Sequence, residues 1–277
     1  MGSEMCIRDR FNAEADSLNC SVLGPDAGPE TPEFELYIEQ LATEMTVKAG
    51  QKCTAIRRAL VPRVLLDEVT DALHARLSGI RVGNPLRDDV DMGALVSLGQ
   101  RDDVRQALST LTTECDLVYG DPDRVDLVDA DPECGAFLSP MLLRCTDPDA
   151  GAPHEVEAFG PVSTLLPYDS ASHAVELATR GAGSLAGSIV SHDDGFVREV
   201  VFGLAPWHGR LLVLDRDDAT ESTGHGAAMP HAVHGGPGRA GGGEELGGMR
   251  AVLHHMQRTA IQGSPTVLGR ITGPELS

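Results

Sequence analysis

The stretch PEFELYIEQLATEMTVKAGQKCTAIRRALVP, residues 32–62, contains a helix pattern, a glycine and a strand pattern in immediate succession. Thr31 stands where a helix N-cap is expected, and Gly50 stands where a helix would stop. Between them the apolar residues recur every three or four positions, as on one face of an α-helix: Phe34, Ile38, Leu41, Met45 and Ala49. The stretch therefore predicts a helix, a turn and a short strand that ends at Pro62, with Cys53 between helix and strand.

The same alternation continues toward the C-terminus. We expect further helices in VLLDEVTDALHARLSGI (64–80), GQRDDVRQALSTLTTE (99–114), HAVELATR (173–180) and GFVREVVFGL (195–204). We expect strands in VSTLLPY (162–168) and SLAGSIVS (184–191). Strands that alternate with amphipathic helices indicate an α/β layered architecture. The acidic, turn-rich stretch 121–137 and the Gly/Pro-rich segment 224–248 are predicted to be loops.

The charge balance narrows the function classes. Lys+Arg number 22 and Asp+Glu 42 in 277 residues, a formal net charge of −20. A surface this acidic repels phosphate backbones and anionic lipid, so we expect no nucleic-acid or membrane partner. No apolar run reaches the roughly 20 residues of a membrane span. The opening MGSEMCIRDR, residues 1–10, resembles a cloning remnant rather than a secretory signal, so we expect a cytoplasmic protein.

Six cysteines are scattered along the chain without a C-x-x-C pair, which favours reduced thiols over a disulfide framework or a zinc site. Cys53 differs from the others because it lies between a helix stop and a strand, where main-chain N–H groups can activate a thiolate. Gln51, Lys52 and Arg57 add a polar, electropositive setting. The alternative is a buried core thiol, and spacing alone leaves this choice open.

Other candidates for chemistry are weaker. Glu14 is a carboxylate among small residues, and a neighbouring Asp16 would raise its pKa toward that of a general base. The glycines in GPGRAG (236–241) match G-x-G-x-x-G, but they follow no strand and include a proline, so we reject a dinucleotide fingerprint. Three histidines, His225, His231 and His234, lie on this Gly/Pro-rich segment without the rigid face that metal ligation needs, so we predict no metal site.

Three motifs become informative together. EMTVKAGQKCTAIRRALVP (44–62) contains G-Q-x-C after a helix, EAFGPV (157–162) contains E-x-F-G-P, and GGEELGGMRAVLHHMQRTAIQG (242–263) contains G-x-E-L-G. In this order and spacing they resemble the aldehyde dehydrogenase family, over essentially residue 11 to the end. FNAEADSLNC (11–20) and residues 222–248 resemble the branch that acts on acyl-CoA semialdehydes in phenylacetate and benzoate degradation.

The resemblance implies a role for each matching residue. Cys53 would be the nucleophile, and Glu14, 39 residues earlier, would be the general base. Glu157 would bind the nicotinamide ribose, and Phe159 would pack near the nicotinamide. The implied cofactor is NADP, with NAD as the alternative. The implied substrate is a small-molecule aldehyde linked to coenzyme A, oxidised to the acid.

The resemblance also implies how the chain is organised. We expect a remnant of the cofactor domain's edge and the helix before the nucleophile in 11–49, the catalytic domain in 50–250, and a C-terminal oligomerisation segment, with a strand, in 251–277. A Rossmann-type cofactor domain would lie mostly before Glu14, so we expect this chain to be a fragment that is inactive alone. The intact parent would be a homo-oligomer.

Two other functions stay open on the sequence. A cysteine hydrolase or thioesterase would use Cys53 with a histidine base, and the nearest histidine, His74, lies on a predicted helix. A non-enzymatic fragment would act only in oligomerisation through the strand that we expect to begin near His254 and His255.

Overall fold

Seven strands form one sheet in the computed structural model, which describes residues 15–217, 219–227, 235–241, 249, 252–253, 256 and 259–272. Neighbouring strands are parallel except β4 and β6, which are antiparallel. Across the sheet the order is β4 (Asp116–Tyr119), β6 (Met141–Arg144), β7 (Val162–Tyr168), β2 (Arg58–Pro62), β1 (Cys20–Leu23), β8 (Ser184–Val190) and β9 (His208–Leu214). A separate two-stranded sheet pairs β3 (Val82–Gly83) with β5 (Leu127–Val128).

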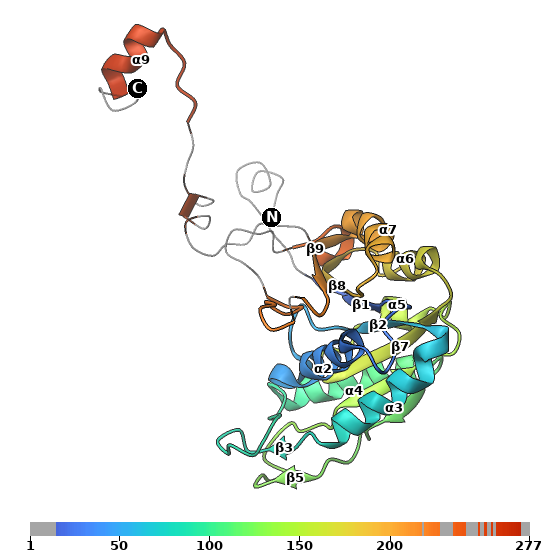
Figure 1. Ribbon diagram of the computed structural model, residues 1–277. Coiled ribbons are helices and arrows are strands. Elements are labelled where there is room, and N and C mark those ends of the chain that lie inside the picture. The colour runs from blue at the N-terminus through green and yellow to red at the C-terminus, as the bar shows by residue number, and fades with distance from the viewer. Residues whose placement is uncertain are drawn as a thin grey trace.

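Helices cover the two faces of the large sheet (Figure 1). On one face, α2 (Pro32–Thr46) and α3 (Leu66–Ser78) bury their apolar stripes against the strands. A second hydrophobic cluster holds α4 (Leu98–Leu111), α6 (Ala171–Thr179) and α7 (Asp194–Leu204). This three-layer arrangement confirms the predicted α/β architecture with a mostly parallel sheet.

The helix of the opening stretch forms as its capping residue dictates. The Thr31 hydroxyl accepts a hydrogen bond of 3.2 Å from Phe34 N, which satisfies one of the N-terminal amides. The regular helix ends at Thr46 rather than at the predicted Ala49, and a 3₁₀ turn, η1 (Val47–Gly50), follows. Lys48, Ala49 and Gly50 all have positive φ angles, of 54°, 52° and 68°. Three consecutive left-handed residues therefore redirect the chain just before Cys53.

The other predicted helices and strands occur within a few residues of their expected ends, and four strands of the sheet were not predicted: β1, β4, β6 and β9. The predicted loop 121–137 includes the two-residue strand β5. The remaining short elements are α5 (Ala152–Glu155) and the 3₁₀ helices η2 (Arg63–Leu65), η3 (Ala205–Trp207) and η4 (Gly238–Ala240).

The C-terminal segment, residues 251–277, is described only in part. Pro265–Thr272 forms a helix, α9, whose start is stabilised because the Ser264 carbonyl accepts hydrogen bonds from Val267 N and Leu268 N, at 3.0 Å each. Pro265 suits the first turn of a helix, where no amide partner is needed. His254 and His255 lie outside the described residues, and assembly of the protein into a homo-oligomer stays a prediction.

The N-terminal segment lies inside the same fold. β1, within the range that we predicted to hold the edge of a cofactor domain, lies in the middle of the sheet between β2 and β8. Cys20 pairs in register with Arg58 on one side and Gly187 on the other. Among the described residues, no helix is long and apolar enough to cross a membrane.

Candidate active site

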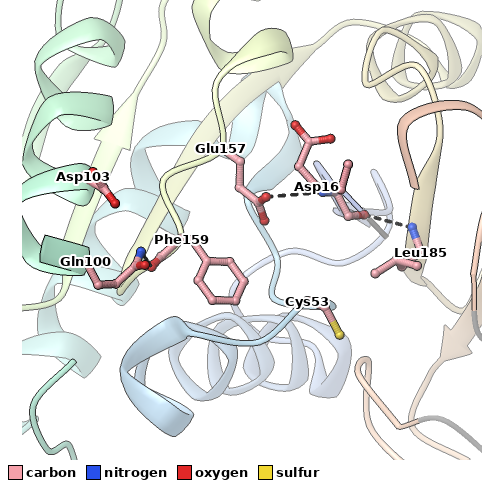
Figure 2. Close-up of a pocket in the computed structure, with 9 residues that line it drawn as sticks. Asp16, Cys53, Gln100, Asp103, Glu157, Phe159 and Leu185 are labelled. Carbon is pink, nitrogen blue, oxygen red and sulfur yellow. Dashed lines mark hydrogen bonds between the residues drawn. The ribbon is translucent and has the colours of Figure 1, made fainter. Parts of the chain in front are cut away.

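A cavity of about 440 Å³ opens at one edge of the large sheet (Figure 2). Its lining combines segments that directly precede β1, β2 and β7, the start of β8 and the first turns of α4: Ala15, Asp16, Ser17, Cys53, Gln100, Asp103, Glu157, Phe159 and Leu185. Because β1, β2, β7 and β8 are parallel, these segments meet at the amino ends of the strands. Ligand sites of open α/β sheets more often lie at the carboxyl ends.

Cys53 is exposed to this cavity, in the turn that joins η1 to β2. The turn is held close to a neighbouring segment at Gly50. A Cβ at that position would lie 2.1 Å from the main-chain oxygen of Gly160, so only glycine fits there. The junction thus presents the thiol to the cavity, and Cys53 is not a buried core thiol.

Asn19, fully buried, ties the Cys53 turn to the sheet. Its amide Nδ2 donates to the main-chain oxygens of Cys53 (2.9 Å) and Ala55 (3.0 Å). Its Oδ1 accepts from Ala186 N (3.0 Å) and from the Ser17 hydroxyl (2.7 Å). One side chain therefore links the Cys53 turn to β8 and to the segment that precedes β1.

Arg57 and Glu157 form an ion pair beside the cavity. Arg57 Nε lies 3.4 Å from Glu157 Oε1, and Arg57 also donates to the oxygens of Gly160 and Gly50, at 2.8 Å each. Glu157 Oε2 accepts a hydrogen bond of 3.4 Å from Ser17 N. Burial raises the pKa of the Glu157 carboxyl, and the Arg57 charge partly opposes that rise. Burial likewise lowers the pKa of Arg57.

Phe159 adds an apolar ring to the cavity wall, between Gln100 and Cys53 in the view of Figure 2. The Arg57 guanidinium lies over the ring, 5.4 Å from its centroid. Gln100 Nε2 donates a hydrogen bond of 2.9 Å to the Phe159 carbonyl. These two contacts fix the segment that carries both Glu157 and Phe159.

The expected electropositive setting of Cys53 is wrong in one respect, because acidic partners offset its two cations. Lys52 Nζ lies 2.6 Å from Glu44 Oε1, and Arg57 pairs with Glu157. Gln51 accepts a hydrogen bond of 3.0 Å from Val96 N instead of facing the thiol. The cavity around Cys53 therefore offers balanced charge and hydrogen-bonding groups rather than a net positive field.

The structure brings three of the four predicted site residues into one cavity: Cys53, Glu157 and Phe159. The fourth, Glu14, lies outside the described residues. Its neighbours Ala15 and Asp16 line the cavity, and Asp16 is paired with Arg239, whose Nε donates to Asp16 Oδ1 at 2.8 Å.

The described histidines do not line this cavity. His74 packs edge-on against Tyr119, with ring centroids 5.0 Å apart. His225 is buried, hydrogen-bonds Ser188 Oγ at 2.9 Å, and burial lowers its pKa to about 3. His231 and His234 lie outside the described residues. No histidine is among the residues that line the described cavity.

A group of possible metal ligands, His192, Asp215 and Asp217, lies elsewhere on the described fold. His192 follows the end of β8 and Asp215 follows the end of β9, so the group occupies the edge of the sheet opposite to Cys53. It is therefore separate from the candidate site.

Sequence reasoning missed Asn19, Gln100 and Asp103 as parts of the site. One feature of the sequence points to Asn19: it is a lone polar amide directly before the apolar run CSVL. A buried asparagine must find hydrogen-bond partners, which predicts a structural role but not which atoms it meets. Gln100 and Asp103 looked like the solvated face of an amphipathic helix.

The family model described as "Aldehyde dehydrogenase family" matches residues 29–206, well over half of the chain. The chain belongs to the aldehyde dehydrogenase family. Over 230 residues it is 47% identical to 3,4-dehydroadipyl-CoA semialdehyde dehydrogenase of Aromatoleum evansii. The aligned region covers 82% of this chain and 44% of that protein. It is 51% identical over 182 residues to Protein MaoC of Klebsiella aerogenes, which covers 65% of this chain and 52% of that protein.

Solved aldehyde dehydrogenases share the fold. The crystal structure of betaine aldehyde dehydrogenase from Staphylococcus aureus in complex with NAD⁺ superimposes with a TM-score of 0.72 and 26% identity. That match covers 87% of this chain and 44% of the other. The chain therefore spans about half the length of the aldehyde dehydrogenases that it matches.

Proposed function

We propose that the whole protein is an NAD(P)-dependent aldehyde dehydrogenase that converts an aldehyde into a carboxylic acid through a thioester on Cys53. One observation carries this proposal: the exposed Cys53 thiol, the Glu157 carboxylate and the Phe159 ring line the same cavity. A nucleophile beside an acceptor and an apolar wall suits an aldehyde placed next to a nicotinamide.

In the first step, Cys53 attacks the aldehyde carbon as the thiolate, forming a carbon–sulfur bond and a thiohemiacetal. Asn19 acts as a positioning residue here, because its two hydrogen bonds to the oxygens of Cys53 and Ala55 hold the turn in one conformation. The thiol group therefore meets substrate without reorganisation of the turn.

The residues that line the cavity fit a nicotinamide riboside. From the residues that the structure describes, Glu157 accepts two long hydrogen bonds, both of 3.4 Å, which leaves acceptor capacity for ribose hydroxyls. Phe159 offers an apolar face for the nicotinamide ring. When bound, the dinucleotide supplies the acceptor for the hydride whose loss turns the thiohemiacetal into a thioester.

Hydrolysis of the thioester needs an activated water. We assign this role to Glu14, which would take a proton from water as the water oxygen attacks the thioester carbon. The carbon–sulfur bond then breaks, the acid leaves and the Cys53 thiol is restored. The two residues that follow Glu14 in the chain line the cavity, which supports the assignment.

The substrate we propose is a semialdehyde linked to coenzyme A. Support comes from 47% identity to a 3,4-dehydroadipyl-CoA semialdehyde dehydrogenase, well above the 28% and 31% identity of more distant relatives. We propose NADP as the preferred dinucleotide and NAD as the alternative.

Two measurements test the proposal. The first uses this chain without cofactor: an activated ester such as p-nitrophenyl acetate should acylate Cys53, and Cys53→Ala should abolish the adduct seen by mass spectrometry. Cys134→Ala is the matched control, since Cys134 is also exposed but lies away from the cavity. Acylation that persists without Cys53 would remove the nucleophile from the proposal.

The second measurement uses the protein encoded by the full open reading frame. An acyl-CoA semialdehyde should produce reduced nicotinamide dinucleotide, at a rate at least 10³-fold lower in Cys53→Ala, as is usual when a nucleophile is removed (about 10⁴ or more). If the protein instead hydrolysed thioesters with no cofactor and lost that activity in one of a series of His→Ala variants, a cysteine hydrolase would replace the dehydrogenase.

A further inference from the structure

Cys115 and Cys145 face each other across the only antiparallel pair of strands in the described sheet. In the register of β4 and β6, Asp116 lies opposite Arg144 and Leu117 lies opposite Leu143. Cys115 directly precedes β4 and Cys145 directly follows β6, so we infer from this register that the two cysteines lie opposite each other. Nothing in the proposed aldehyde chemistry uses these two thiols.

The main-chain hydrogen bonds show which kind of pair this is. Cys115 N donates to Leu111 O and Cys145 N donates to Leu165 O, each at 2.9 Å. Neither amide donates to the other cysteine, which is the arrangement of a non-hydrogen-bonded pair. Such pairs have Cα atoms about 4.5 Å apart, within the roughly 4.4–6.8 Å that a disulfide spans. We therefore expect the backbone to accept a disulfide with little movement of either strand.

The side chains lie on the same face and touch. Cys115 is 5% exposed and Cys145 is fully buried, both within one hydrophobic cluster. The Cys145 thiol donates hydrogen bonds to the main-chain oxygens of Asp147, at 3.0 Å, and of Glu114, the residue directly before Cys115, at 3.5 Å. The thiol–thiol contact and burial raise the pKa of Cys115, while the same contact lowers the pKa of Cys145.

We propose that Cys115 and Cys145 are a redox modification site, which hydrogen peroxide converts into a disulfide that ties β4 to β6. The Cys145 thiolate attacks one peroxide oxygen; the O–O bond breaks, hydroxide leaves and takes up a proton, and Cys145 becomes a sulfenic acid. Cys115 sulfur then attacks Cys145 sulfur, and the S–O bond breaks to release a second water. Two thiols lose two electrons and two protons, and one peroxide becomes two waters.

The location of the pair gives the oxidant a path. Within the described sheet, β4 is an edge strand that pairs with β6 alone, and its residues are exposed or half-buried. Edge strands open more readily than central ones, and a small neutral oxidant needs only a brief opening. Cys20, by contrast, is fully buried on the central strand β1, 3.4 Å from His208 Nε2, with no cysteine opposite it in the register.

The test is a peptide map of peroxide-treated protein. Cleavage after arginine separates three cysteines onto three peptides: 106–124 with Cys115, 125–144 with Cys134 and 145–180 with Cys145. We expect the first and third peptides to be joined under non-reducing conditions and to separate on addition of dithiothreitol. The closed loop should raise the thermal midpoint by about 10 °C, the shift expected for a loop of this length in a domain of this size.

Two variants control the map. Cys134→Ala should leave both the link and the shift unchanged. Cys145→Ala should abolish both, and alanine keeps the core apolar so that the protein still folds. The proposal is overturned if 106–124 and 145–180 stay unlinked while Cys134 is oxidised, or if Cys134 replaces either partner in the link. A link without any rise in the thermal midpoint would equally contradict it, because the bond would then join strands held in a non-native arrangement.

Discussion

The side-chain amide of Asn19 lies 2.9 Å from the main-chain oxygen of Cys53 and accepts, on its other atom, the N–H of Ala186. This relationship joins three segments that are far apart in the sequence at the point where the thiol is presented. It makes Asn19 a positioning residue rather than a catalytic one.

Replacing Asn19 by alanine should therefore disturb both stability and reactivity. The change leaves the buried carbonyl of Ala55 and the N–H of Ala186 without partners, which should lower the free energy of unfolding by about 3 kcal/mol. Urea titration measures the first effect, and the rate of Cys53 alkylation by iodoacetamide measures the second. Asn84→Ala, in the loop next to β3, is the control and should change neither by much. Unchanged alkylation in Asn19→Ala would remove the positioning role.

Gly50→Ala should damage the same turn by a different route. The new methyl group would meet the Gly160 oxygen, and φ at this position is +68°, so both contact and backbone conformation oppose it. We expect a loss of at least about 2 kcal/mol in unfolding free energy and a slower reaction of Cys53. Gly28→Ala is the matched control, because a methyl group there meets nothing within 4 Å. Equal stability of the two variants would show that the turn can move away from Gly160.

The Arg57–Glu157 pair should be strongly coupled. Glu157→Ala leaves the buried guanidinium of Arg57 with its main-chain carbonyl contacts alone. This should lower the free energy of unfolding by about 3 kcal/mol. Arg57→Met should also lower the free energy of unfolding. The double variant should lose clearly less unfolding free energy than the two single variants lose together. Unfolding free energies of the four proteins measure the coupling. Strict additivity would mean that the ion pair does not contribute.

Acid should weaken the contact between α2 and the segment after β9. A hydrogen bond from Arg216 lowers the pKa of the Glu33 carboxyl from about 4.5 to about 2. A folded-state pKa below the unfolded one means that the unfolded chain binds the proton first as pH falls. The contribution is therefore fully present above about pH 4.5 and is lost between 4.5 and 2.

Glu33→Gln should remove this part of the acid sensitivity. Since Arg216 is partly exposed and screened, we expect a contribution on the order of 1 kcal/mol. Unfolding free energies at pH 6 and pH 3 measure it. Glu35→Gln, at an exposed position on the same helix, is the control and should lose as much unfolding free energy between pH 6 and pH 3 as the original protein. An equal loss in Glu33→Gln would contradict the assignment.

The amphipathic helices could be predicted from the sequence because each keeps a solvent-exposed face, which gives a period of 3.6 in the apolar pattern. α2, α3 and α4 are of this kind. β1 could not be predicted in this way, because all four of its residues are buried and the sequence therefore shows no alternation of apolar and polar positions. β4 and β6 are equally short. They lie beside the acidic loop 121–137, whose charged and turn-forming residues obscure their strand pattern in the sequence.

The candidate site was predictable where chemistry leaves a local motif. Cys53 in G-Q-x-C and the pair Glu157 and Phe159 in E-x-F-G-P were named from such motifs, and the fold brings them to one cavity. Asn19 could not be assigned a role, since its partners Cys53 and Ala186 are 34 and 167 residues away. Hydrogen bonds at that separation are a product of the topology.

The central position of β1 has a consequence for how the chain folds. Residues 20–23 are synthesised more than 160 residues before their neighbour on one side, residues 187–190. Until that strand has left the ribosome, β1 presents an unpaired apolar edge in the middle of an unfinished sheet. Parallel strand pairs with such a long sequence separation form slowly. Strand edges that stay unpaired during folding promote aggregation. Yield of the correctly assembled protein should thus depend on slow synthesis, low temperature or chaperones more than on the stability of the finished sheet.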